Sequence, residues 1–282
     1  MFHFFRVFLL FFVSFCSIGY ARDVALVITH HFNRPDFIEI QFQTLKKFMR
    51  TPYRFVVFND AKTCELEDAI QSSCDRLGVE CIRIPQNIHK TPNDPAIACA
   101  DVVNYSLQNL GLSHDGYMMI LDADMFLVKP FDIDNYMKDT IIAGHPQVRG
   151  HVNYIWNGIF ILDVPNLIDK QSVDFSCGMV EGELCDVGGY MYYYFQKHPE
   201  IRMKAMVPHY YLGNFYKKDL RLLPPFAQWM CQQRNYNCEF FIGDTFFHYR
   251  SGGNWDHRSA SYHIRKTKIL HQFIEKVMKE TY

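Results

Sequence analysis

Short apolar runs alternate with helical patterns through the first half of the chain. A continuous apolar, β-branched stretch predicts a buried strand at residues 24–29, and further runs rich in apolar residues predict strands at residues 53–58, 79–84 and 116–121. Apolar residues at helical spacing predict helices over about residues 36–49, 65–77 and 96–110. Strands that alternate with helices pair in parallel, with helices on both faces of the sheet. The pattern therefore predicts an α/β fold around a mostly parallel central sheet.

The second half of the chain is less regular. Apolar patterning predicts strands at residues 140–144, 158–162 and 240–247. It predicts helices at residues 171–183 and 190–197, and a basic helix at about residues 262–279. The sequence contains no internal repeat, low-complexity segment or linker, so a single domain over residues 22–282 is favoured.

Two carboxylates interrupt a largely apolar run at residues 117–131. Asp122 and Asp124 flank Ala123, and side chains at positions i and i+2 of an extended chain point to the same side. Carboxylates are costly to bury unless they are paired or bind a metal. Two carboxylates that converge at a strand end are suitable ligands for Mg²⁺ or Mn²⁺ carrying a diphosphate. The alternative is a solvated turn between two strands, which the apolar flanks disfavour.

Two other predicted strands also end in polar residues. Thr29 and His30 close the first strand, and Asp60 follows the second. Parallel sheets bind ligands in the crevice beyond the carboxyl ends of their strands. We therefore expect these residues to share one crevice with Asp122 and Asp124.

The amino-terminal residues have the features of a secretory signal. Arg6 is the one charged residue before Ala21, and residues 7–13 are continuously apolar. We expect residues 1–21 to be a signal peptide cleaved after Ala21, with an uncleaved anchor as the alternative, because the apolar run is short for a membrane span. No second span follows in the sequence. The expected location is the secretory pathway: the ER or Golgi lumen in a eukaryote, and the periplasm or the cell exterior in a bacterium.

The nine cysteines include Cys16 of the leader, which leaves eight in the expected mature chain. An even number in an exported protein favours disulfide bonds. Two pairs are close enough in sequence to form local loops, Cys177 with Cys185 and Cys231 with Cys238, but the spacing leaves the connectivity open. No cysteine spacing typical of a zinc site occurs.

Charge and composition exclude one class of partner. Lys plus Arg number 29, against 30 for Asp plus Glu, so the chain has no strong basic field and we expect no nucleic-acid partner. The chain is rich in Phe and Tyr, with 25 and 17 residues. We expect most of these rings in the core and a smaller share in a ligand cleft.

The order of these features resembles the GT-A-fold glycosyltransferases, which use a nucleotide-sugar donor and a DXD metal motif. Residues 122–124 match DXD in its usual setting, after an apolar strand. The resemblance covers roughly residues 24–255. It implies one GT-A-like, Rossmann-like domain over residues 22–282, in which residues 22–130 bind the nucleotide and residues 131–282 bind the acceptor and the sugar.

The resemblance also implies a Mn²⁺ (or Mg²⁺) cofactor, a UDP-sugar donor and a glycan, lipid or protein acceptor. The implied metal ligands are Asp122, Asp124 and His248. The implied donor-binding residues are Thr29, His30, Asp60, Asp122, Ala123, Asp124 and Arg250. His248 resembles the late histidine of a His-x-x-Gly-x-x-Lys-Pro-Trp segment, but residues 248–255 reproduce neither the lysine nor the proline. Arg250 is the expected source of the missing positive charge, since a guanidinium suits bidentate phosphate contact.

The resemblance places the acceptor and the transferred sugar against two later segments. The implied residues are Trp156, Asn157, Gly158, Gly188 and Gly189, where glycine lets the backbone approach the sugar closely. Asp186 is the implied catalytic carboxylate, either as a base toward the acceptor hydroxyl or as a stabiliser of the sugar cation. Each of three residues also has a purely structural interpretation. Trp156 also suits a core, and Asp60 and Asp186 also suit turns or helix caps.

Two other functions remain as alternatives. A nucleotidyltransferase shares the alternating sheet and the metal carboxylates, but it needs a glycine-rich, basic first loop to hold a triphosphate. Residues 29–34 contain no glycine, which argues against it. A non-catalytic, exported glycan-binding module with the same fold stays open.

Overall fold

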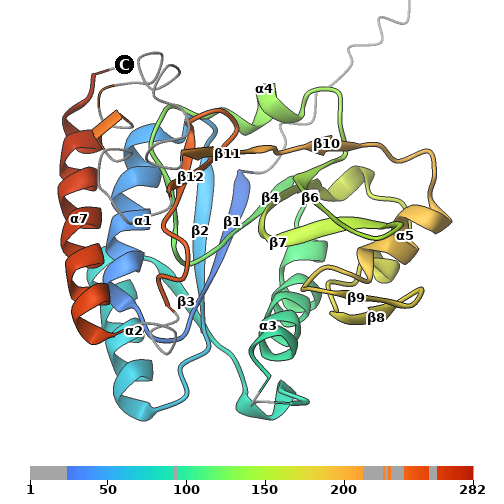
Figure 1. The fold of residues 1–282 in the computed structure, drawn as a ribbon, viewed down its shortest axis with the longest axis horizontal. Coiled ribbons are helices and arrows are strands. Elements are labelled where there is room, and N and C mark those ends of the chain that lie inside the picture. The colour runs from blue at the N-terminus through green and yellow to red at the C-terminus, as the bar shows by residue number, and fades with distance from the viewer. Residues whose placement is uncertain are drawn as a thin grey trace, which may run out of the picture.

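A central sheet of seven strands organises the structure (Figure 1). The computed structural model describes residues 24–91, 94–211, 225, 228–229, 238–253 and 259–281. In spatial order the strands are β10 (Met203–Ala205), β6 (Ile142–Arg149), β7 (Val152–Asp163), β4 (Tyr117–Leu121), β1 (Ala25–His31), β2 (Tyr53–Asn59) and β3 (Glu80–Arg83). Neighbours pair in parallel, except that β7 runs antiparallel to both β4 and β6. The predicted α/β fold around a mostly parallel sheet is confirmed.

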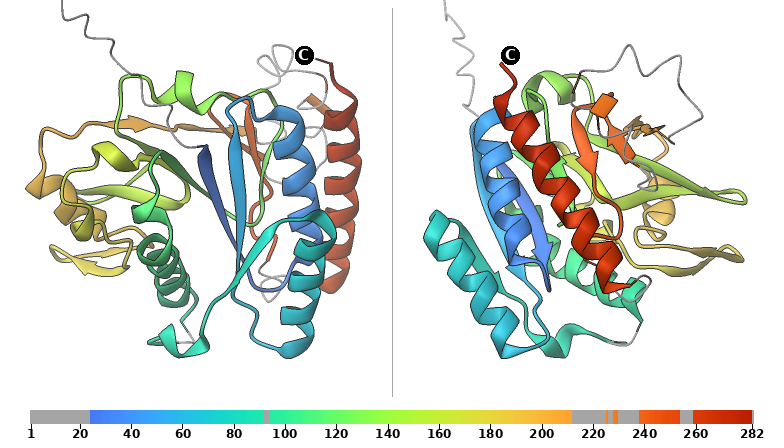
Figure 2. Two further views of the ribbon diagram at one scale, coloured as in Figure 1. Left: turned by 180° about the vertical axis from the view of Figure 1, so that it is seen from behind. Right: turned by 60° about the vertical axis from the view of Figure 1, so that its left-hand side comes forward.

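Helices cover both faces of this sheet (Figures 1 and 2). On one face lie α1 (Pro35–Phe48), α2 (Cys64–Leu77) and α7 (Ala260–Lys279), and on the other lies α3 (Pro95–Asn109). The sheet has a hydrophobic core on each face, and alternate residues of β1 pack into each of them. Val27 packs on the side of α1, and Ile28 packs on the side of α3. The shorter helices are α4 (Ile133–Met137), α5 (Met191–Lys197), η1 (Gln86–Ile88), η2 (Gly111–Ser113), η3 (Val164–Asn166) and η4 (Lys170–Ser172).

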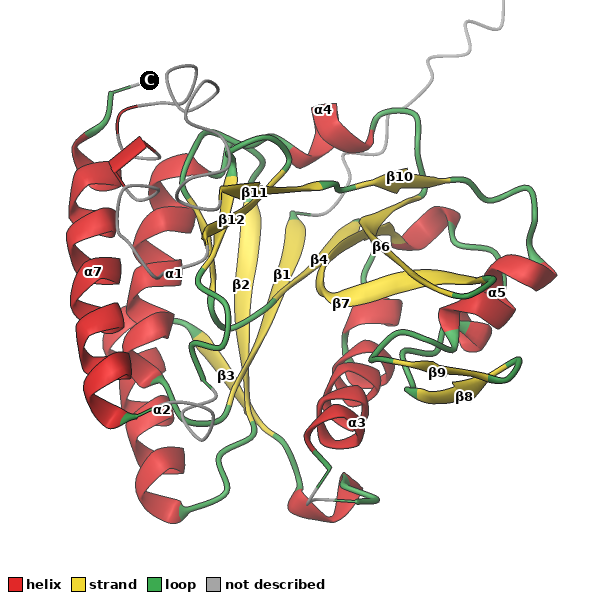
Figure 3. Cartoon of the chain, in the orientation of Figure 1, coloured by secondary structure: helices red, strands yellow, loops and turns green. Residues whose placement is uncertain are grey.

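A second, antiparallel sheet joins the two halves of the chain (Figure 3). Its order is β11 (Pro208–Tyr211), β12 (Cys238–Phe241), β13 (Phe246–His248) and β5 (Met125–Leu127). A separate hairpin consists of β8 (Gly178–Val180) and β9 (Glu183–Cys185). β5 begins directly after Asp124, and its pairing with β13 places His248 opposite Met125. This register brings a late histidine to the carboxyl end of β4.

Side chains at the helix ends supply partners for backbone groups that the helices leave unpaired. Thr63 caps α2 by accepting a hydrogen bond from a backbone N–H, and Gly78 ends that helix in the left-handed conformation. Asp94 caps α3, which begins with Pro95, and Ser259 caps α7. The start of each of these three helices therefore has a local cause in the sequence.

The structure corrects two predictions in the second half. Residues 171–183, expected as a helix, contain the end of η4 and the strand β8. Gly178 and Gly182 adopt φ values of +130° and +85°, which glycine takes readily and which stop a helix. Residues 240–247, expected as one strand, form parts of two antiparallel strands, because the chain turns at Ile242, whose φ is +53°. Gly243, whose φ is +67°, and Asp244 lie in this turn and are the sequence signal for it.

Several sequence predictions fall outside what the structure tests. The expected signal peptide, residues 1–21, and Cys231 lie outside the described residues. Each helix in the described ranges is too short or too polar to cross a membrane. The described cysteine side chains are thiols, namely those of Cys64, Cys74, Cys81, Cys99, Cys177 and Cys185. The disulfide framework and the single-domain boundary remain predictions.

Gly188 makes the tightest backbone approach to β7. Its φ is +94°, and a Cβ at this position would lie 1.8 Å from the carbonyl oxygen of Ile155. Gly188→Ala is expected to lower the free energy of unfolding by about 3 kcal/mol, because positive-φ strain and overpacking each cost about 1–3 kcal/mol. Urea denaturation measures this loss. Gly78→Ala is the matched control, since its φ is +66° with no heavy atom within 4 Å of the added Cβ. Equal losses in the two variants would contradict the packing explanation.

Candidate metal and nucleotide site

Two adjoining cavities open at the carboxyl ends of β1, β2 and β4. The first cavity has a volume of about 180 Å³, and its lining includes His30, Asp60, Cys99, Val102, Ile120 and Asp122. The second cavity has a volume of about 400 Å³, and its lining includes Cys99, Asp122, Asp124, Trp156, His248 and Arg250. Cys99 and Asp122 line both cavities, so the two spaces meet at the end of β4.

The predicted metal ligands converge in the second cavity. One ligand atom each from Asp122, Asp124 and His248 lies within 4.8 Å of the other two. The Asp122 N–H donates to the Gly158 carbonyl at 2.8 Å, and the Met125 N–H donates to the Asp122 carbonyl at 3.0 Å. These bonds form the tight turn from β4 into β5. The turn directs both carboxylates toward the imidazole of His248, the last residue of β13.

Asp124 is 7% exposed, and its two carboxylate oxygens have separate partners. Oδ2 accepts a hydrogen bond from the Gly252 N–H at 2.7 Å, and Oδ1 lies 3.3 Å from His248 Nε2. Burial alone would raise the pKa of Asp124. The charge and hydrogen bond of His248, together with the Gly252 amide, lower that pKa below its ordinary value. Asp124 is therefore held as a carboxylate.

Glu239 orients His248 from behind. The Glu239 carboxylate is 4% exposed and lies 2.5 Å from His248 Nδ1. Nδ1 donates its proton to Glu239, and Nε2, on the other side of the ring, faces Asp124. Metal-binding histidines are commonly oriented by a carboxylate in the same way. Burial opposes a charge on the imidazole, but Asp124 and Glu239 raise the pKa of His248 to about 10. A proton on Nε2 thus occupies the position that a metal cation would take.

The pKa of Asp122 reflects the repulsion between the two carboxylates of the cluster. Its Oδ1 accepts a hydrogen bond from the Ala123 N–H at 2.9 Å. Burial and the nearby Asp124 carboxylate nevertheless raise the pKa of Asp122 to about 7. Two carboxylates and an imidazole form a donor set that suits Mn²⁺ or Mg²⁺, and a dication would relieve the repulsion between the carboxylates. The residues present therefore fit the divalent ion that the sequence predicts.

The loop after β13 is held in a left-handed backbone conformation. Arg250 and the residue after it have φ values of +35° and +57°. From α7, the buried ammonium group of Lys266 donates to the carbonyls of Tyr249, at 2.5 Å, and of Arg250. With these carbonyls turned toward α7, the amide of Gly252, two residues after Arg250, donates to Asp124.

The connection from β1 to α1 holds the same loop from its other side. The Asn33 amide donates to the Gly253 carbonyl at 2.6 Å, and the Arg34 guanidinium donates to the Gly252 carbonyl at 3.0 Å. A Cβ on Gly252 would lie 2.8 Å from Asp124 Cβ. Glycine is therefore required here by the close approach of the loop to the metal cluster.

Arg250 brings a positive charge to the mouth of the second cavity. Its side chain is 46% exposed, and its Nε lies 3.6 Å from Glu239 Oε2. The left-handed turn directs this side chain toward the cavity that contains the metal cluster. The structure therefore brings Arg250 to the place where the sequence predicts a contact with the donor.

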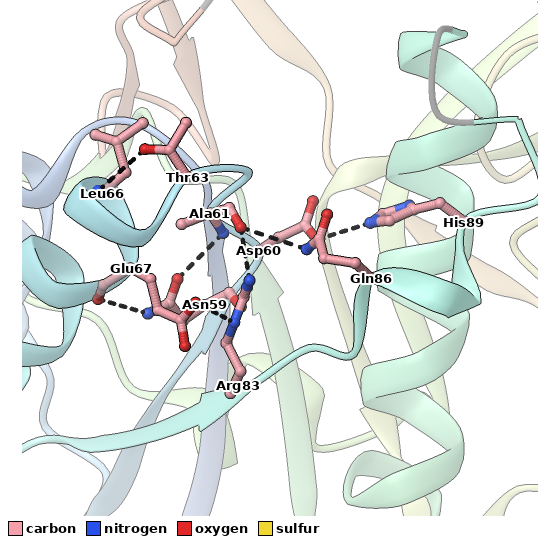
Figure 4. A network of polar contacts seen from close by, with 9 residues as sticks. All are labelled: Asn59, Asp60, Ala61, Thr63, Leu66, Glu67, Arg83, Gln86 and His89. Atoms are coloured by element: carbon pink, nitrogen blue, oxygen red, sulfur yellow. Dashed lines mark hydrogen bonds and ion pairs between the residues drawn. The ribbon is translucent and has the colours of Figure 1, made fainter.

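Asp60 borders the first cavity from the end of β2 (Figure 4). His89 Nε2 lies 2.8 Å from Asp60 Oδ1, and the Gln86 amide donates to the same oxygen at 3.5 Å. Burial raises the pKa of Asp60, and hydrogen bonding and charge from His89 only partly oppose this. The carboxylate is thus oriented by η1 and the residue after it.

Arg83 of β3 fixes the backbone that carries Asp60. Its guanidinium donates to the carbonyls of Asn59 and Ala61, at 2.7 Å each, and its Nε lies 3.1 Å from Glu67 Oε2. The Asn59 amide also donates to the Glu67 carbonyl at 3.1 Å (Figure 4). β3 and α2 together therefore determine the conformation at the end of β2.

The two residues predicted at the end of β1 point to opposite faces of the sheet. His30 lines the first cavity, and its Nε2 lies 2.8 Å from Ser106 Oγ. Burial, with a smaller effect of His31, lowers the pKa of His30 to about 3, so this ring is neutral. Thr29 is fully buried on the same face as Val27 and lines neither cavity.

The predicted acceptor residues of β7 are divided between the cavities. Trp156 lines the second cavity and stacks on Phe241, with ring centroids 5.9 Å apart. Asn157 lines the first cavity, and its amide donates to Cys99 Sγ at 3.3 Å. A Cβ on Gly158 would lie 2.0 Å from the Trp156 ring, so this glycine makes room for the indole.

Asp186, Gly188 and Gly189 lie outside both cavities. Asp186 is exposed, and its carboxylate accepts a hydrogen bond from the Val187 N–H at 2.8 Å. Its own N–H donates to the Tyr154 hydroxyl at 3.1 Å, which fixes the turn against β7. Both glycines are buried by packing. The structure does not bring these three residues to the metal cluster, and their roles stay predictions.

Gln41, Glu239 and Lys266 support the site although no sequence motif contains them. Each is 5% exposed or less. The Gln41 amide donates to the Asp122 carbonyl at 2.8 Å. The one sequence signal for Gln41 and Lys266 is a polar residue on the apolar face of a predicted helix, which is costly to bury without a specific partner.

Fold and site together define an α/β protein with a divalent-metal cluster in the crevice of its sheet. No protein-family model and no curated protein sequence matches the chain. Similar solved structures include core-mannan synthase A (CmsA/Ktr4) from Aspergillus fumigatus in a Mn/GDP form, at 11% identity and a TM-score of 0.36, covering 53% of this chain and 62% of that one.

Two further solved structures are mannosyltransferases. Ktr4p from S. cerevisiae shows 13% identity and a TM-score of 0.36, covering 50% of this chain and 56% of that one. PcManGT from Pyrobaculum calidifontis, in complex with GDP-Man and Mn²⁺, shows 13% identity and a TM-score of 0.43, covering 65% of this chain and 55% of that one. The chain thus spans between 55% and 62% of the length of these three proteins.

The cluster geometry predicts the effect of two substitutions on Mn²⁺ affinity. Asp124→Asn removes a charged ligand and is expected to abolish detectable binding. Glu239→Gln leaves all three ligands in place but weakens the orientation of His248, so the affinity is expected to fall about 10–100-fold. Electron paramagnetic resonance, which detects free Mn²⁺, measures the Mn²⁺ affinity of both variants in the presence of a nucleoside diphosphate. Glu80→Gln, on the exposed side of β3, is the matched control. A wild-type Mn²⁺ affinity in Glu239→Gln would contradict the role of Glu239 in orienting His248.

Proposed function

We propose that the chain is a metal-dependent glycosyltransferase that moves a sugar from a nucleoside-diphosphate donor to an acceptor hydroxyl. The observation that carries this proposal is the cluster of Asp122, Asp124 and His248 at the junction of two cavities. A nucleotide sugar has the matching order, with a nucleoside at one end, a diphosphate in the middle and a sugar beyond it. The mainly apolar first cavity suits the nucleoside, and the second cavity suits the diphosphate and the sugar.

The charges around the second cavity suit the departure of a diphosphate. Glycosyl transfer breaks the bond between the anomeric carbon and a phosphate oxygen, with an oxocarbenium-like transition state. A bound Mn²⁺ or Mg²⁺ supplies Lewis-acid neutralisation of the leaving diphosphate. The Arg250 guanidinium adds charge-assisted hydrogen bonds to the phosphate oxygens from the cavity mouth. Glu239 and the Gly252 amide keep His248 and Asp124 in their orientations.

Asp60 and His30 are the proposed contacts to the nucleoside. His89 and Gln86 orient the Asp60 carboxylate from one of its oxygens, and the other oxygen is the proposed acceptor for a ribose hydroxyl or a base N–H. The sequence resemblance favours a UDP-sugar, whereas two of the similar solved structures contain GDP or GDP-mannose. Thermal-shift measurements with UDP and GDP in the presence of Mn²⁺ distinguish the two bases, because a ligand that binds the folded state raises the Tm.

The acceptor side of the proposal depends on two residues. Trp156 provides an aromatic wall of the second cavity, a surface on which sugars stack. Asp186 stays the proposed base toward a glycan, lipid or protein acceptor. We further propose that residues 1–21 direct the chain into the secretory pathway.

The proposal predicts metal-dependent turnover that depends on Asp124. Asp124→Ala is expected to lower donor hydrolysis or sugar transfer by about 10²–10³-fold, because the metal supplies several kcal/mol of transition-state stabilisation. Release of UDP or GDP from a panel of nucleotide sugars, with and without Mn²⁺, measures this. Glu80→Gln is the control, and Asp186→Asn tests the proposed base. Equal activity of wild type and Asp124→Ala would reject the proposal, as would glycan binding without nucleotide affinity.

A further inference from the structure

Cys74 and Cys81 form a thiol pair between α2 and the edge strand β3. Cys74 lies in the last turn of α2 and is fully buried. Cys81 is the second residue of β3 and is half-buried against the same core. Both side chains belong to the same core cluster, and the two thiols lie close enough to interact directly with each other.

The backbone brings these residues together for reasons that do not involve sulfur. α2 ends at Gly78 in the left-handed conformation, and the Val79 N–H donates to the Cys74 carbonyl at 2.9 Å, which turns the chain directly into β3. Cys81 pairs in parallel register with Val57, whose side chain belongs to the core on the side of α2. Residues in register on neighbouring strands point to the same face, so Cys81 faces α2.

We propose that Cys74 and Cys81 form an intramolecular disulfide bond that ties α2 to β3. Each thiol loses one proton and one electron as the S–S bond forms. The two electrons reduce a disulfide oxidant, such as oxidised glutathione, to two thiols, which take up the two protons. The proposal does not depend on the glycosyltransferase activity.

Cys64 lies at the opposite end of the same helix. It is the first residue of α2, exposed, and ten residues before Cys74. At 1.5 Å per residue this separation is about 15 Å along the helix axis, which is too far for Cys64 to replace Cys74 beside Cys81. Cys64 is therefore a control for the proposed bond, because it is a cysteine of the same helix that is not expected to pair with Cys81.

The proposed bond lies beside the network that positions Asp60. Cys81 precedes Arg83 by two residues, and Arg83 pairs in register with Asn59 of β2. Arg83 connects the end of β2 to Glu67 of α2 (Figure 4). Among the described strands β3 has one neighbour, β2, so the edge strand depends on α2 for further support. A covalent tie would hold α2, β3 and the end of β2 as one unit.

Peptide mapping tests the bond directly. The full chain is incubated with oxidised and reduced glutathione, its remaining thiols are alkylated, and it is digested with trypsin without reduction. Cleavage after Lys62, Arg76 and Arg83 gives peptide 63–76, with Cys64 and Cys74, and peptide 77–83, with Cys81. We expect a linked pair that is lighter than the two free peptides by two hydrogen atoms. Alkylated Cys74 and Cys81 in separate peptides would overturn the proposal.

Single substitutions identify the sulfur involved. The linked pair is expected to persist in Cys64→Ser and to be missing from Cys74→Ser and Cys81→Ser. A linked pair that disappears in Cys64→Ser would assign the bond to Cys64 and overturn the proposal.

Thermal unfolding tests the structural consequence. A reductant is expected to lower the Tm of the wild type by several degrees more than that of the Cys74→Ala/Cys81→Ala double variant, since a disulfide restricts the unfolded chain. Equal shifts would contradict a stabilising bond between α2 and β3.

Discussion

The burial of like charges at the end of β4 is the constraint on which the rest of the site depends. Asp122 and Asp124 lie close together in a cleft, Asp124 buried and Asp122 half-buried, and like charges that are shielded from water destabilise each other. His248 compensates Asp124, while Glu239 compensates His248. Three carboxylates surround this imidazole, and the Arg250 guanidinium lies beside Glu239. A divalent cation would relieve the remaining repulsion between Asp122 and Asp124.

The second half of the chain completes a site that the first half begins. The β4–β5 turn supplies both carboxylates, and the pairing of β5 with β13 supplies the imidazole. The left-handed loop after β13 is held by Lys266 from α7 and by Arg34 from the β1–α1 connection. Three segments far apart in the sequence thus converge on Asp124. A loop that is fixed on both sides presents its amide and Arg250 to the cavity without reorganisation on binding, which favours tight, oriented contacts.

The sequence predicts the first half of the fold well, because continuous apolar strands and amphipathic helices leave a strong periodic pattern. It predicts Asp122 and Asp124 because a DXD motif after a strand is a local feature, and it predicts His248 only through the resemblance to a family with a late histidine ligand. It does not predict Glu239 or Lys266, whose roles depend on contacts between distant segments. Thr29 shows a different limit, since it is fully buried inside β1, while His30 and His31, nearer the strand end, line the cavities. The predicted helix at 171–183 is wrong because glycines with positive φ redirect the chain there.

Anomalous scattering at the manganese edge would locate the bound metal in the structure. Crystals of the full chain grown with Mn²⁺ and a nucleoside diphosphate are expected to show one strong anomalous peak. That peak is expected within bonding distance, about 2.0–2.3 Å, of the Asp122 and Asp124 carboxylates and His248 Nε2. A peak elsewhere, or a well-ordered nucleotide whose diphosphate lies away from these three side chains, would contradict it.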